Sequence, residues 1–353
     1  MGLREYVVRR CVYMFMLIIA VICFNFILFR LPTFLFGVDP ISLMISDDLR
    51  SRMTTEFLER IYTSFGLVMN PDIFDWIYMF WRYLVNMLTG NFGVSFLSQR
   101  PVMDTIVERL PNTLLLMGSA LMVSVLLGMW TGIKVASDPG SKKDLGAVTV
   151  GLFMYSLPFF WLGMVLLMFF GYMLPAWTQA TFGVEIGLPQ FGTISYEVWD
   201  AARMNPLGAL MVAGDVLIHL VLPMMTLALG AFGGWFLYMR NNLVTVMTED
   251  YILTARAKGL DENQVLYKHG LKNAMLPMVT LIALAFGGVI TGTVLIETVF
   301  TWRGLGRYIF ESLIALDFPV VQAIFLIIAI VKIVANFVAD LLYGMLDPRI
   351  KYG

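Results

Sequence analysis

Polar residues suited to recognition gather in one stretch of this sequence, residues 249–273, between two apolar segments. Glu249 begins the stretch with negative charge, and Arg256 and Lys258 follow with positive charge. Acidic side chains stabilise the N-terminal end of a helix and basic side chains its C-terminal end, because each opposes the partial charge of the helix dipole there. Gly259 then supplies a residue that readily adopts the left-handed conformation in which many helices end. The pattern predicts a short, charged helix that ends at Gly259.

Asp261 and Gln264 predict a second helix directly after that glycine. An acceptor side chain followed three residues later by Gln or Glu is typical of a capping box at a helix N-terminus. This helix is predicted to reach Asn273, and Pro277 then marks the entry into the next apolar segment. Residues 249–273 are therefore expected to form a loop of two helices joined by a glycine.

Small and basic residues alternate near the end of the first predicted helix. Ala255, Ala257 and Gly259 carry little bulk, so that the backbone of another protein can approach closely. Arg256 and Lys258 stand between them, and their charge can fix the register of an acidic partner. Two interpretations remain open: a docking surface for a partner protein, or a solvated helical loop whose positive charge only sets the membrane topology.

Polar residues also occur inside the last apolar segment. Lys332, Asn336 and Asp340 are spaced four apart, which places them on one face of a helix. Charged groups within a membrane span are costly and usually face protein or water. This face is predicted either to border a translocation path or a partner subunit, or to pair locally with other helices or headgroups. In the preceding apolar segment, Gly288 and Gly292 form a small-xxx-small pattern, which favours close helix packing over substrate contact.

Motifs for independent chemistry are absent from the sequence. It has no Gly-x-x-x-x-Gly-Lys-Ser/Thr phosphate loop, no His-Glu-x-x-His zinc motif and no Gly-x-Ser-x-Gly nucleophile elbow. The two histidines, His219 and His269, are predicted to lie on opposite sides of a membrane and to have structural roles. The chain is therefore not expected to be an enzyme, and no catalytic residue, metal ligand or cofactor of its own is predicted.

Membrane helices are expected to hold these residues in place. Of the 353 residues, 59% are hydrophobic and 14% are charged, whereas soluble domains carry about 25% charged residues. The excess apolar surface requires lipid as a second solvent, and a helix needs about 20 apolar residues to cross it. Apolar segments of roughly this length occur at residues 11–29, 114–133, 145–173, 216–239, 274–298 and 320–343. No Lys/Arg-rich run occurs, which argues against binding to nucleic acid.

The sequence thus predicts an all-α polytopic membrane protein with six transmembrane helices. Basic residues are denser in the segments that lie inside when both termini are cytoplasmic, so we expect that orientation. Residues 1–29 then hold the cytoplasmic N-terminus and the first span, and residues 30–110 form an extracytoplasmic insertion. Residues 111–353 form a five-helix core, with the cytoplasmic loop at 240–273 between the fourth and fifth spans.

The insertion is predicted to be helical. Thr54 has N-cap chemistry and Gly66 can end the helix that Thr54 begins. A second helix is expected over residues 71–88, where apolar residues recur at helical spacing. The expected location of this helix is the membrane surface or the side of the helix bundle.

The predicted loop closely resembles the EAA loop of ABC importer permeases. The resemblance rests on Tyr-Ile-Leu-Thr-Ala-Arg-Ala-Lys-Gly at 251–259 and on Lys-His-Gly-Leu-Lys-Asn-Ala-Met-Leu-Pro at 268–277. The chain is most similar to the first permease subunit of the dipeptide/oligopeptide (peptide/opine/nickel) class. Further segments resemble that class in the same order along the chain, at residues 90–95, 100–113, 297–306 and 340–350.

What this resemblance implies is a multi-pass transport subunit of a prokaryotic cell membrane. Such a permease pairs with a paralogous second permease, and two ATP-binding subunits, which carry ATP and Mg²⁺, dock on the EAA loops. An extracytoplasmic substrate-binding protein delivers a peptide or a short oligosaccharide. Nickel or another solute, and a self-sufficient secondary transporter, remain alternatives. The implied ATPase-coupling residues are Glu249, Tyr251, Thr254, Ala255, Arg256, Ala257, Lys258, Gly259 and His269.

Overall fold

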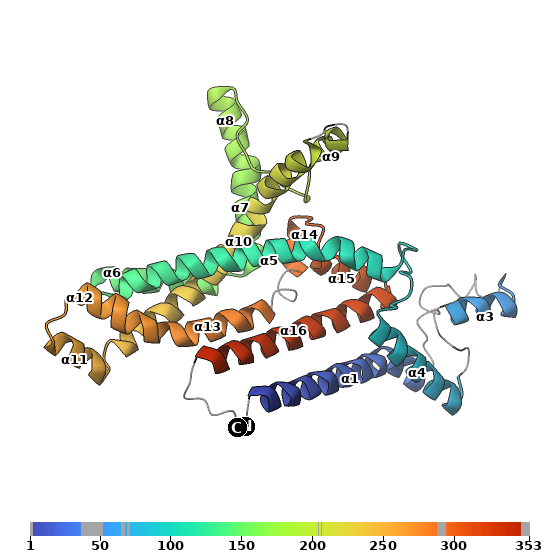
Figure 1. Cartoon of the computed structure of the whole chain (residues 1–353). Coiled ribbons are helices and arrows are strands. Elements are labelled where there is room, and N and C mark those ends of the chain that lie inside the picture. The colour runs from blue at the N-terminus through green and yellow to red at the C-terminus, as the bar shows by residue number, and fades with distance from the viewer. Residues whose placement is uncertain are drawn as a thin grey trace. The chain divides into compact units, whose positions relative to one another are not determined.

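The structure is a computed structural model, and it describes residues 3–36, 52–64, 68, 71–203, 205, 207–287 and 294–346. Most of these residues lie in helices (Figure 1), and the β-structure among them is one isolated bridge between Val94 and Pro101. The chain divides into two units, which are described separately below. The first comprises mainly Met1–Pro111 and Tyr308–Val334, and the second mainly Asn112–Arg307 and Ala335–Lys351.

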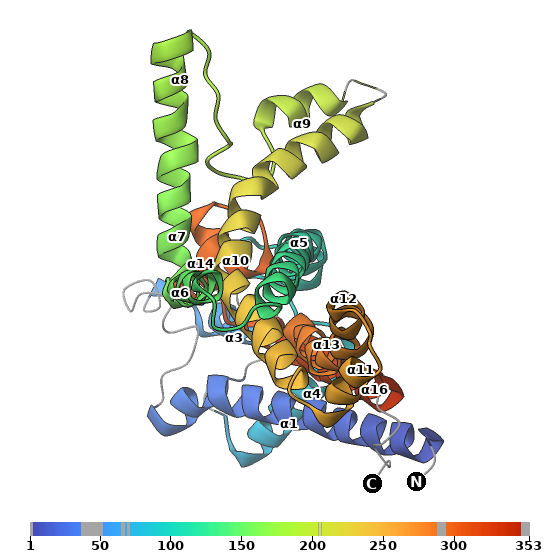
Figure 2. The same ribbon diagram turned by 90° about the vertical axis from the view of Figure 1, so that its left-hand side faces the viewer.

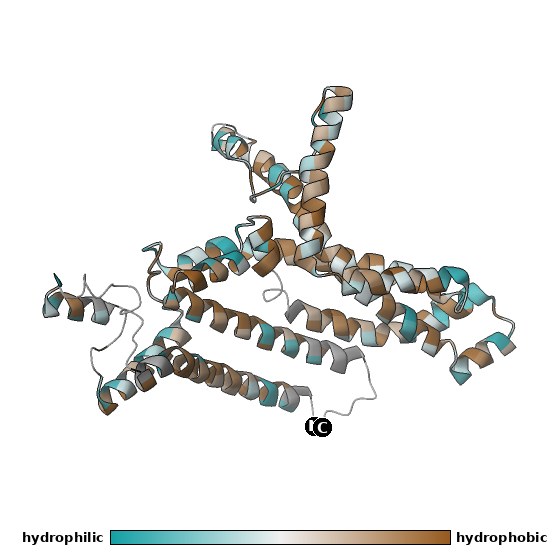
Figure 3. Cartoon of the chain, turned by 180° about the vertical axis from the view of Figure 1, so that it is seen from behind, coloured by the Kyte–Doolittle hydropathy of each residue, from teal (hydrophilic) through white to brown (hydrophobic). Residues whose placement is uncertain are grey.

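Five helices of the described chain are long and apolar enough to cross a membrane. Their apolar spans cover Val7–Arg30, Val102–Ala136, Phe159–Phe182, Gly208–Val246 and Phe318–Val338. The first lies in α1 (Leu3–Phe36), the second is α5 (Val102–Ala136), the fourth is α10 (Gly208–Val246) and the last lies in α16 (Phe318–Leu346). Figure 3 shows hydrophobic residues along most of their lengths. The prediction of an all-α polytopic membrane protein is confirmed.

The fifth predicted span, residues 274–298, cannot be followed from end to end. Helix α13 covers Leu271–Gly287 and helix α14 covers Val294–Val299. Gly288 and Gly292, the proposed packing pair, lie outside the described residues. The predicted number of six spans therefore stays a prediction.

The third predicted span, residues 145–173, is not one continuous helix. Helix α6 (Lys142–Ser156) ends at Leu157, which is extended with φ −74° and ψ 132°, and α7 (Phe159–Leu166) begins after Pro158. A residue before proline is forced out of the helical region by a clash with the proline ring, and proline has no N–H for the helix ladder. Hydropathy alone does not register this break. The apolar run continues through the π-helix η1 (Leu167–Met173) and α8 (Leu174–Phe182).

The segment between the apolar runs that end at residue 173 and begin at residue 216 is largely helical. Helix α8 ends at Gly183, which has a φ of 73°, helix α9 spans Tyr196–Arg203, and α10 begins at Gly208. Within the second unit, Figures 1 and 2 both show α8, α9 and the first turns of α10 projecting away from the helices α5, α6 and α13. The sequence prediction missed α9, because charged residues interrupt its apolar ones, and missed the first turns of α10, because Asp215 separates them from the long apolar segment.

Both predicted helices of the segment after α1 are present in the first unit. Helix α3 covers Thr55–Ser64 and α4 covers Ile73–Thr89, whereas Gly66, the predicted end of α3, lies outside the described residues. Asp72 and Asp75 form a reciprocal capping box at the start of α4, with N–H···O distances of 2.8 and 3.0 Å. Its Tyr83 packs on α1, where the Phe26 ring centroid lies 5.4 Å from that of Tyr83.

A buried carboxylate joins distant segments of the first unit. Asp317, just before α16, is fully buried and accepts a hydrogen bond from Ser95 Oγ at 2.6 Å. The backbone N–H groups of Phe96 and Leu97 donate to the same carboxylate at 3.0 and 3.2 Å. Residues 90–95, one of the segments that resemble the permease class, thus end in a turn built around Asp317.

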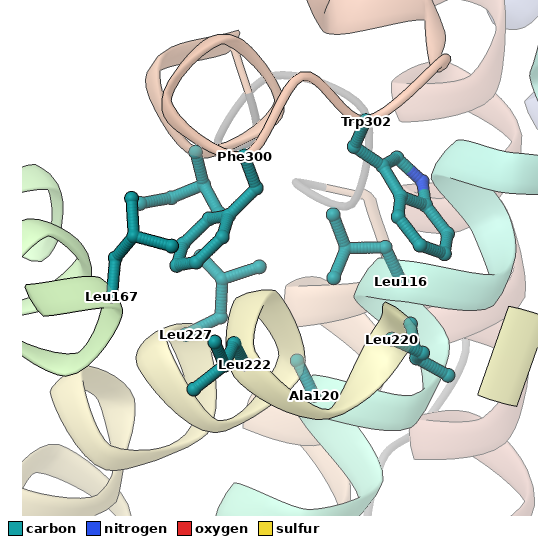
Figure 4. Close-up of a cluster of buried hydrophobic side chains, with 9 residues drawn as sticks. Leu116, Ala120, Leu167, Leu220, Leu222, Leu227, Phe300 and Trp302 are labelled. Atoms are coloured by element: carbon teal, nitrogen blue, oxygen red, sulfur yellow. The ribbon is translucent and has the colours of Figure 1, made fainter. Parts of the chain in front are cut away.

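The core of the second unit lies where α5, η1, α10 and α14 meet (Figure 4). Leu116 and Ala120 of α5 pack there with aliphatic residues of η1 and α10. Phe300 and Trp302, which follow α14, insert from the other side and are 2% and 0% exposed. Burial of an aromatic side chain contributes about 1.5–3 kcal/mol, so these residues hold the segment after α14 firmly on the helices.

Candidate functional site

The predicted loop between the fourth and fifth apolar segments begins with a short helix. Helix α11 spans Asp250–Ala257, and Glu249 occupies its N-cap position without making a side-chain cap hydrogen bond. Gly259 follows with a φ of 76°, in the left-handed region that side chains disfavour. The predicted helix and its glycine end are both confirmed.

The second half of the loop differs from its prediction. The chain continues without interruption through α12 (Glu262–Gln264), the π-helix η2 (Val265–Gly270) and α13. Asn273 therefore does not end a helix, and Pro277 lies inside α13, where its missing N–H costs a single helix bond. Asp261 caps α12 through the N–H of Asn263 at 3.1 Å, so the predicted capping box with Gln264 is not formed.

The inner face of the loop is a small apolar core. Ile252 and Val265 are fully buried and Ala255 is 5% exposed, with Met247 and Leu260 packed around them. Residues three apart on a helix share one face, so Ile252 and Ala255 are buried together. The side chain of Ala255 thus packs inside the loop, whereas its predicted role in docking stays a prediction.

The outer face of α11 is open to solvent. Tyr251 and Leu253 are 39% and 57% exposed, and Ala257 and Gly259 are exposed beside them. Further exposed residues of the predicted coupling set are Glu249, Thr254, Arg256 and Lys258, whereas His269 of η2 is half-buried. An exposed surface of apolar, small and charged side chains on a short helix is suited to contact with another protein.

Two polar contacts tie the halves of the loop together. Arg256 donates two hydrogen bonds to Glu262, at 2.9 and 3.2 Å, and Asn273 Nδ2 donates to Tyr251 Oη at 2.7 Å. The sequence suggested that Arg256 pairs with an acidic partner, but in this chain its guanidinium is already engaged with Glu262. The loop is consequently a preformed body rather than a flexible connection.

An ion pair that the sequence did not indicate fixes the end of α10 that leads into the loop. Arg240 Nε donates to Asp144 Oδ1 at 2.9 Å and its NH2 group donates to Oδ2 at 2.5 Å. Asp144 is 3% exposed and also accepts from the Gly140 N–H at 2.7 Å. The hydrogen bonds from Arg240 hold the pKa of the Asp144 carboxyl below its usual value, against the opposing effect of burial. The Ser141–Asp144 spacing signals a helix start, but nothing in it reveals Arg240.

An apolar cavity of about 660 Å³ opens on the same helices. Tyr155 and Phe159 line it on one side, Trp235 and Tyr238 of α10 on another, and Leu284 of α13 on a third. The described residues around it include no charged side chain. Its walls are thus the two helices that enter and leave the loop, together with α6 and α7.

The polar face predicted for the last span lies on α16 as expected from its spacing. Lys332 and Asn336 are exposed and Asp340 is half-buried with an interaction partner of its own. These positions fit either open interpretation, a translocation surface or local pairing.

One cluster resembles a hydrolytic triad in composition but not in order. Ser195 Oγ donates to Asp215 Oδ1 at 2.9 Å, and His219 Nδ1 lies 3.3 Å from Asp215 Oδ2. A nucleophilic serine needs the histidine as its direct base, whereas here the aspartate stands between the two. The cluster therefore joins the start of α9 to α10. No group of His, Cys, Asp and Glu in the described part of the chain could hold a metal ion.

Comparison with known proteins matches the sequence of this chain to membrane transport components. Residues 124–352 match the family described as binding-protein-dependent transport system inner membrane component. The oligopeptide transport system permease protein AppB of Bacillus subtilis (strain 168) is 33% identical over 351 residues, covering 99% of this chain and 100% of AppB. The glutathione transport system permease protein GsiC of Escherichia coli (strain K12) is 36% identical over 276 residues, covering 78% of this chain and 79% of GsiC. GsiC of Salmonella paratyphi A is also similar, at 36% identity over 274 residues that cover 77% of this chain and 79% of GsiC.

Proposed function

Because the chain belongs to the family of binding-protein-dependent transport system inner membrane components, we propose that it is the permease subunit of an ATP-driven peptide importer. The family consists of membrane permeases of ABC transporters, which work with ATPase and substrate-binding subunits. The observation that carries the proposal is the loop at residues 249–273. Its exposed outer face is built on a buried core and on two internal polar contacts.

The stiffness of this loop explains how ATP-driven closure of the ATPase can be coupled to movement of the membrane helices. A docked ATPase subunit that closes on ATP would push on the face formed by Tyr251, Leu253 and Ala257. The buried core of Ile252 and Val265 keeps the loop from deforming, so the push becomes a rigid-body movement of α10 and α13. Rigid-body movement between two stable arrangements is how such proteins switch the side from which a site is open.

The remaining subunits complete the importer. We infer one paralogous permease, two ATPase subunits that bind ATP and Mg²⁺ and perform the hydrolysis, and one extracytoplasmic substrate-binding protein. Neither ATP nor another cofactor is then needed in this chain. The exposed side chains of Lys332 and Asn336 on α16 are candidates for the surface that faces the translocation path or the second permease.

Peptides are the favoured substrate because AppB and GsiC are named for oligopeptide and glutathione transport. Short oligosaccharides, nickel and other solutes are the alternatives within the same class. A self-sufficient secondary transporter would have no use for a preformed docking loop, and purification of the chain with an ATPase would separate that possibility from the proposal.

A bulky residue on the outer face of the loop tests the docking assignment. Ala257→Trp places an indole on exposed α11, whereas Ala201→Trp makes the same change on α9, which is also exposed and also eight residues long. We expect Ala257→Trp to insert normally but to lose both the co-purifying ATPase and peptide uptake, and Ala201→Trp to retain both. Recovery of normal amounts of ATPase with Ala257→Trp would show that α11 is not the docking helix.

Orientation is tested separately with a tag at the C-terminus. The proposed cytoplasmic position of both termini implies that the tag is protected from added protease in intact cells and cleaved only after the cells are opened. Cleavage in intact cells would reverse the topology and place the loop on the wrong side for an ATPase.

A further inference from the structure

The ion pair of Asp144 and Arg240 joins the start of α6 to the end of α10 that leads into the loop. Arg240 lies near the C-terminal end of α10, and α10 leads through Met247 directly into the loop. Met247 packs against the loop core of Ile252, Ala255 and Val265, and a Cβ atom on Gly270 would lie 2.8 Å from its Sδ atom. The last turns of α10 and the loop therefore form one packed body.

Asp144 fastens α6 to that body. Its carboxylate receives two hydrogen bonds from one guanidinium, at 2.9 and 2.5 Å, and a third from the Gly140 N–H. Bidentate arginine–carboxylate pairs fix direction as well as distance. Because Asp144 is 3% exposed, water competes poorly for these hydrogen bonds. Ser141 Oγ also caps the Asp144 N–H at 3.2 Å, so the carboxylate sits on the rigid first turn of α6.

Farther along, α6 and α10 approach too closely to slide past each other. A Cβ atom on Gly233 of α10 would overlap the backbone carbonyl of Gly151 in α6. A Cβ atom on Gly151 would in turn lie 2.6 Å from the Phe236 ring. Such close-packed interfaces transmit displacement instead of absorbing it. Helix α6 therefore moves with α10 as long as the N-terminal end of α6 is held.

We propose that Asp144 is a positioning residue for transport. Its ion pair with Arg240 holds α6 to the last turns of α10, which lead into the loop at residues 249–273, so that ATP-driven movement of this loop carries α6 with it. This inference rests on the proposed function of the chain. It extends the moving body from α10 and α13, which are joined to the loop covalently, to a helix that is joined to it by side chains. Loss of the ion pair uncouples hydrolysis from transport without removing the docking surface.

The test compares peptide uptake per ATP hydrolysed in the complete reconstituted transporter. Asp144→Asn keeps the shape of the side chain and removes its charge. Asp138→Asn makes the same change at an exposed aspartate in the connection between α5 and α6 and serves as the control. We expect Asp144→Asn to retain ATPase activity within about twofold and to lower uptake per ATP about tenfold, the factor expected when a charge-assisted hydrogen bond is lost. Asp138→Asn should match the wild-type chain.

A charge reversal and a distance measurement keep the inference testable if Asp144→Asn also weakens the fold. Asp144→Arg combined with Arg240→Asp should recover part of the uptake per ATP that either single change loses. Spin labels at the exposed positions Lys143 and Thr245 should keep one distance with and without ATP in the wild-type complex, and acquire a second distance in Asp144→Asn.

Three results would contradict the inference. They are an unchanged uptake per ATP in Asp144→Asn, a parallel loss of ATPase and uptake with unchanged label distances, and a label distance that changes with ATP in the wild-type complex. A wild-type complex without any ATP-dependent uptake would contradict the proposed function itself, and this inference with it.

Discussion

Thr113 Oγ1 donates a 2.8 Å hydrogen bond to the carboxylate of Glu297, and the same hydroxyl accepts a 2.8 Å hydrogen bond from the backbone N–H of Leu305 at the start of α15 (Leu305–Ile314). Glu297 is fully buried, and its second oxygen accepts from the Arg307 N–H at 2.8 Å. Two of the segments that resemble the permease class, near residues 113 and 300, are therefore halves of one polar structure in the second unit.

The same structure is closed from its other side by Trp302 and Asn112. Trp302 Nε1 donates to the Asn112 carbonyl at 3.0 Å, and Asn112 Nδ2 donates to the Arg303 carbonyl at 2.8 Å. Buried polar groups are stabilising only when their partners are present. The segment after α14 is thus held to α5 by reciprocal hydrogen bonds, each of which can be removed individually.

Thr113→Val removes the hydroxyl at nearly constant volume. The buried Glu297 carboxylate loses a donor and the Leu305 N–H loses its acceptor, at a cost of roughly 2–4 kcal/mol for the two groups together. We expect a lower thermal midpoint of the detergent-solubilised chain. Thr113→Ser keeps the hydroxyl and should lower the thermal midpoint far less. An equal decrease for both variants would show that packing, not hydrogen bonding, matters at this position.

Gly304→Ala tests how closely the chain passes the same carboxylate. A Cβ atom on Gly304 would overlap the carboxyl group of Glu297, and overpacking of this kind costs about 1–3 kcal/mol. Gly118→Ala is the matched control, because its Cβ has no neighbour within 4 Å and it lies within helix α5. The thermal midpoint should fall for Gly304→Ala and stay equal or rise for Gly118→Ala. A fall in both would indicate a general effect of the substitution.

The Asp144–Arg240 ion pair should give stability that depends on pH. Arg240 lowers the pKa of Asp144 in the folded chain, whereas an unfolded aspartate titrates near pH 3.9. The stabilisation is therefore fully present above about pH 5 and is lost as the pH falls through the folded pKa. Asp144→Asn should lower the unfolding free energy by roughly 2–3 kcal/mol at neutral pH.

The difference between wild type and Asp144→Asn should begin to shrink near pH 4, where the carboxylate of the unfolded chain becomes protonated, and should vanish as the pH falls through the lowered pKa of the folded chain. Thermal unfolding of both chains across the range from neutral to acid measures it. A difference that stays constant down to the lowest pH would mean that the carboxylate charge does not contribute.

Gly259 tests the backbone of the coupling loop apart from its surface. Its φ is 76° and a Cβ atom there would meet nothing within 4 Å, so strain is the only penalty for a side chain. Gly259→Val should cost about 1–2 kcal/mol and raise amide hydrogen exchange in α11. Gly259→Asn should cost less stability and raise the exchange less, because asparagine tolerates the left-handed region. Equal exchange in both variants would argue that the loop absorbs the strain.

Local chemistry was enough to predict much of this chain. The apolar segments indicated a membrane protein, because lipid requires long runs of apolar residues whatever their neighbours. The start of the helix near residue 71 and the end of α11 at Gly259 were also predicted to within a few residues, since a helix end depends on the conformations of a few adjacent residues. The resemblance of residues 251–277 then located the candidate functional loop.

Other features depend on which distant segments meet. Hydropathy did not register the break at Leu157, although the following proline signals it. The burial of Ala255 required Val265 to fold back onto α11. Asp144 and Arg240 are 96 residues apart, and each alone resembles an ordinary charged residue at a helix end.

Hydropathy and interactions within one helical turn were enough to predict the lipid environment, most of the long helices and a few of their ends. Tertiary contacts decide which charged side chains are buried and which groups they pair with. A buried carboxylate is stable only beside its donors, and the donors of Asp144, Glu297 and Asp317 come mostly from segments far away in the chain.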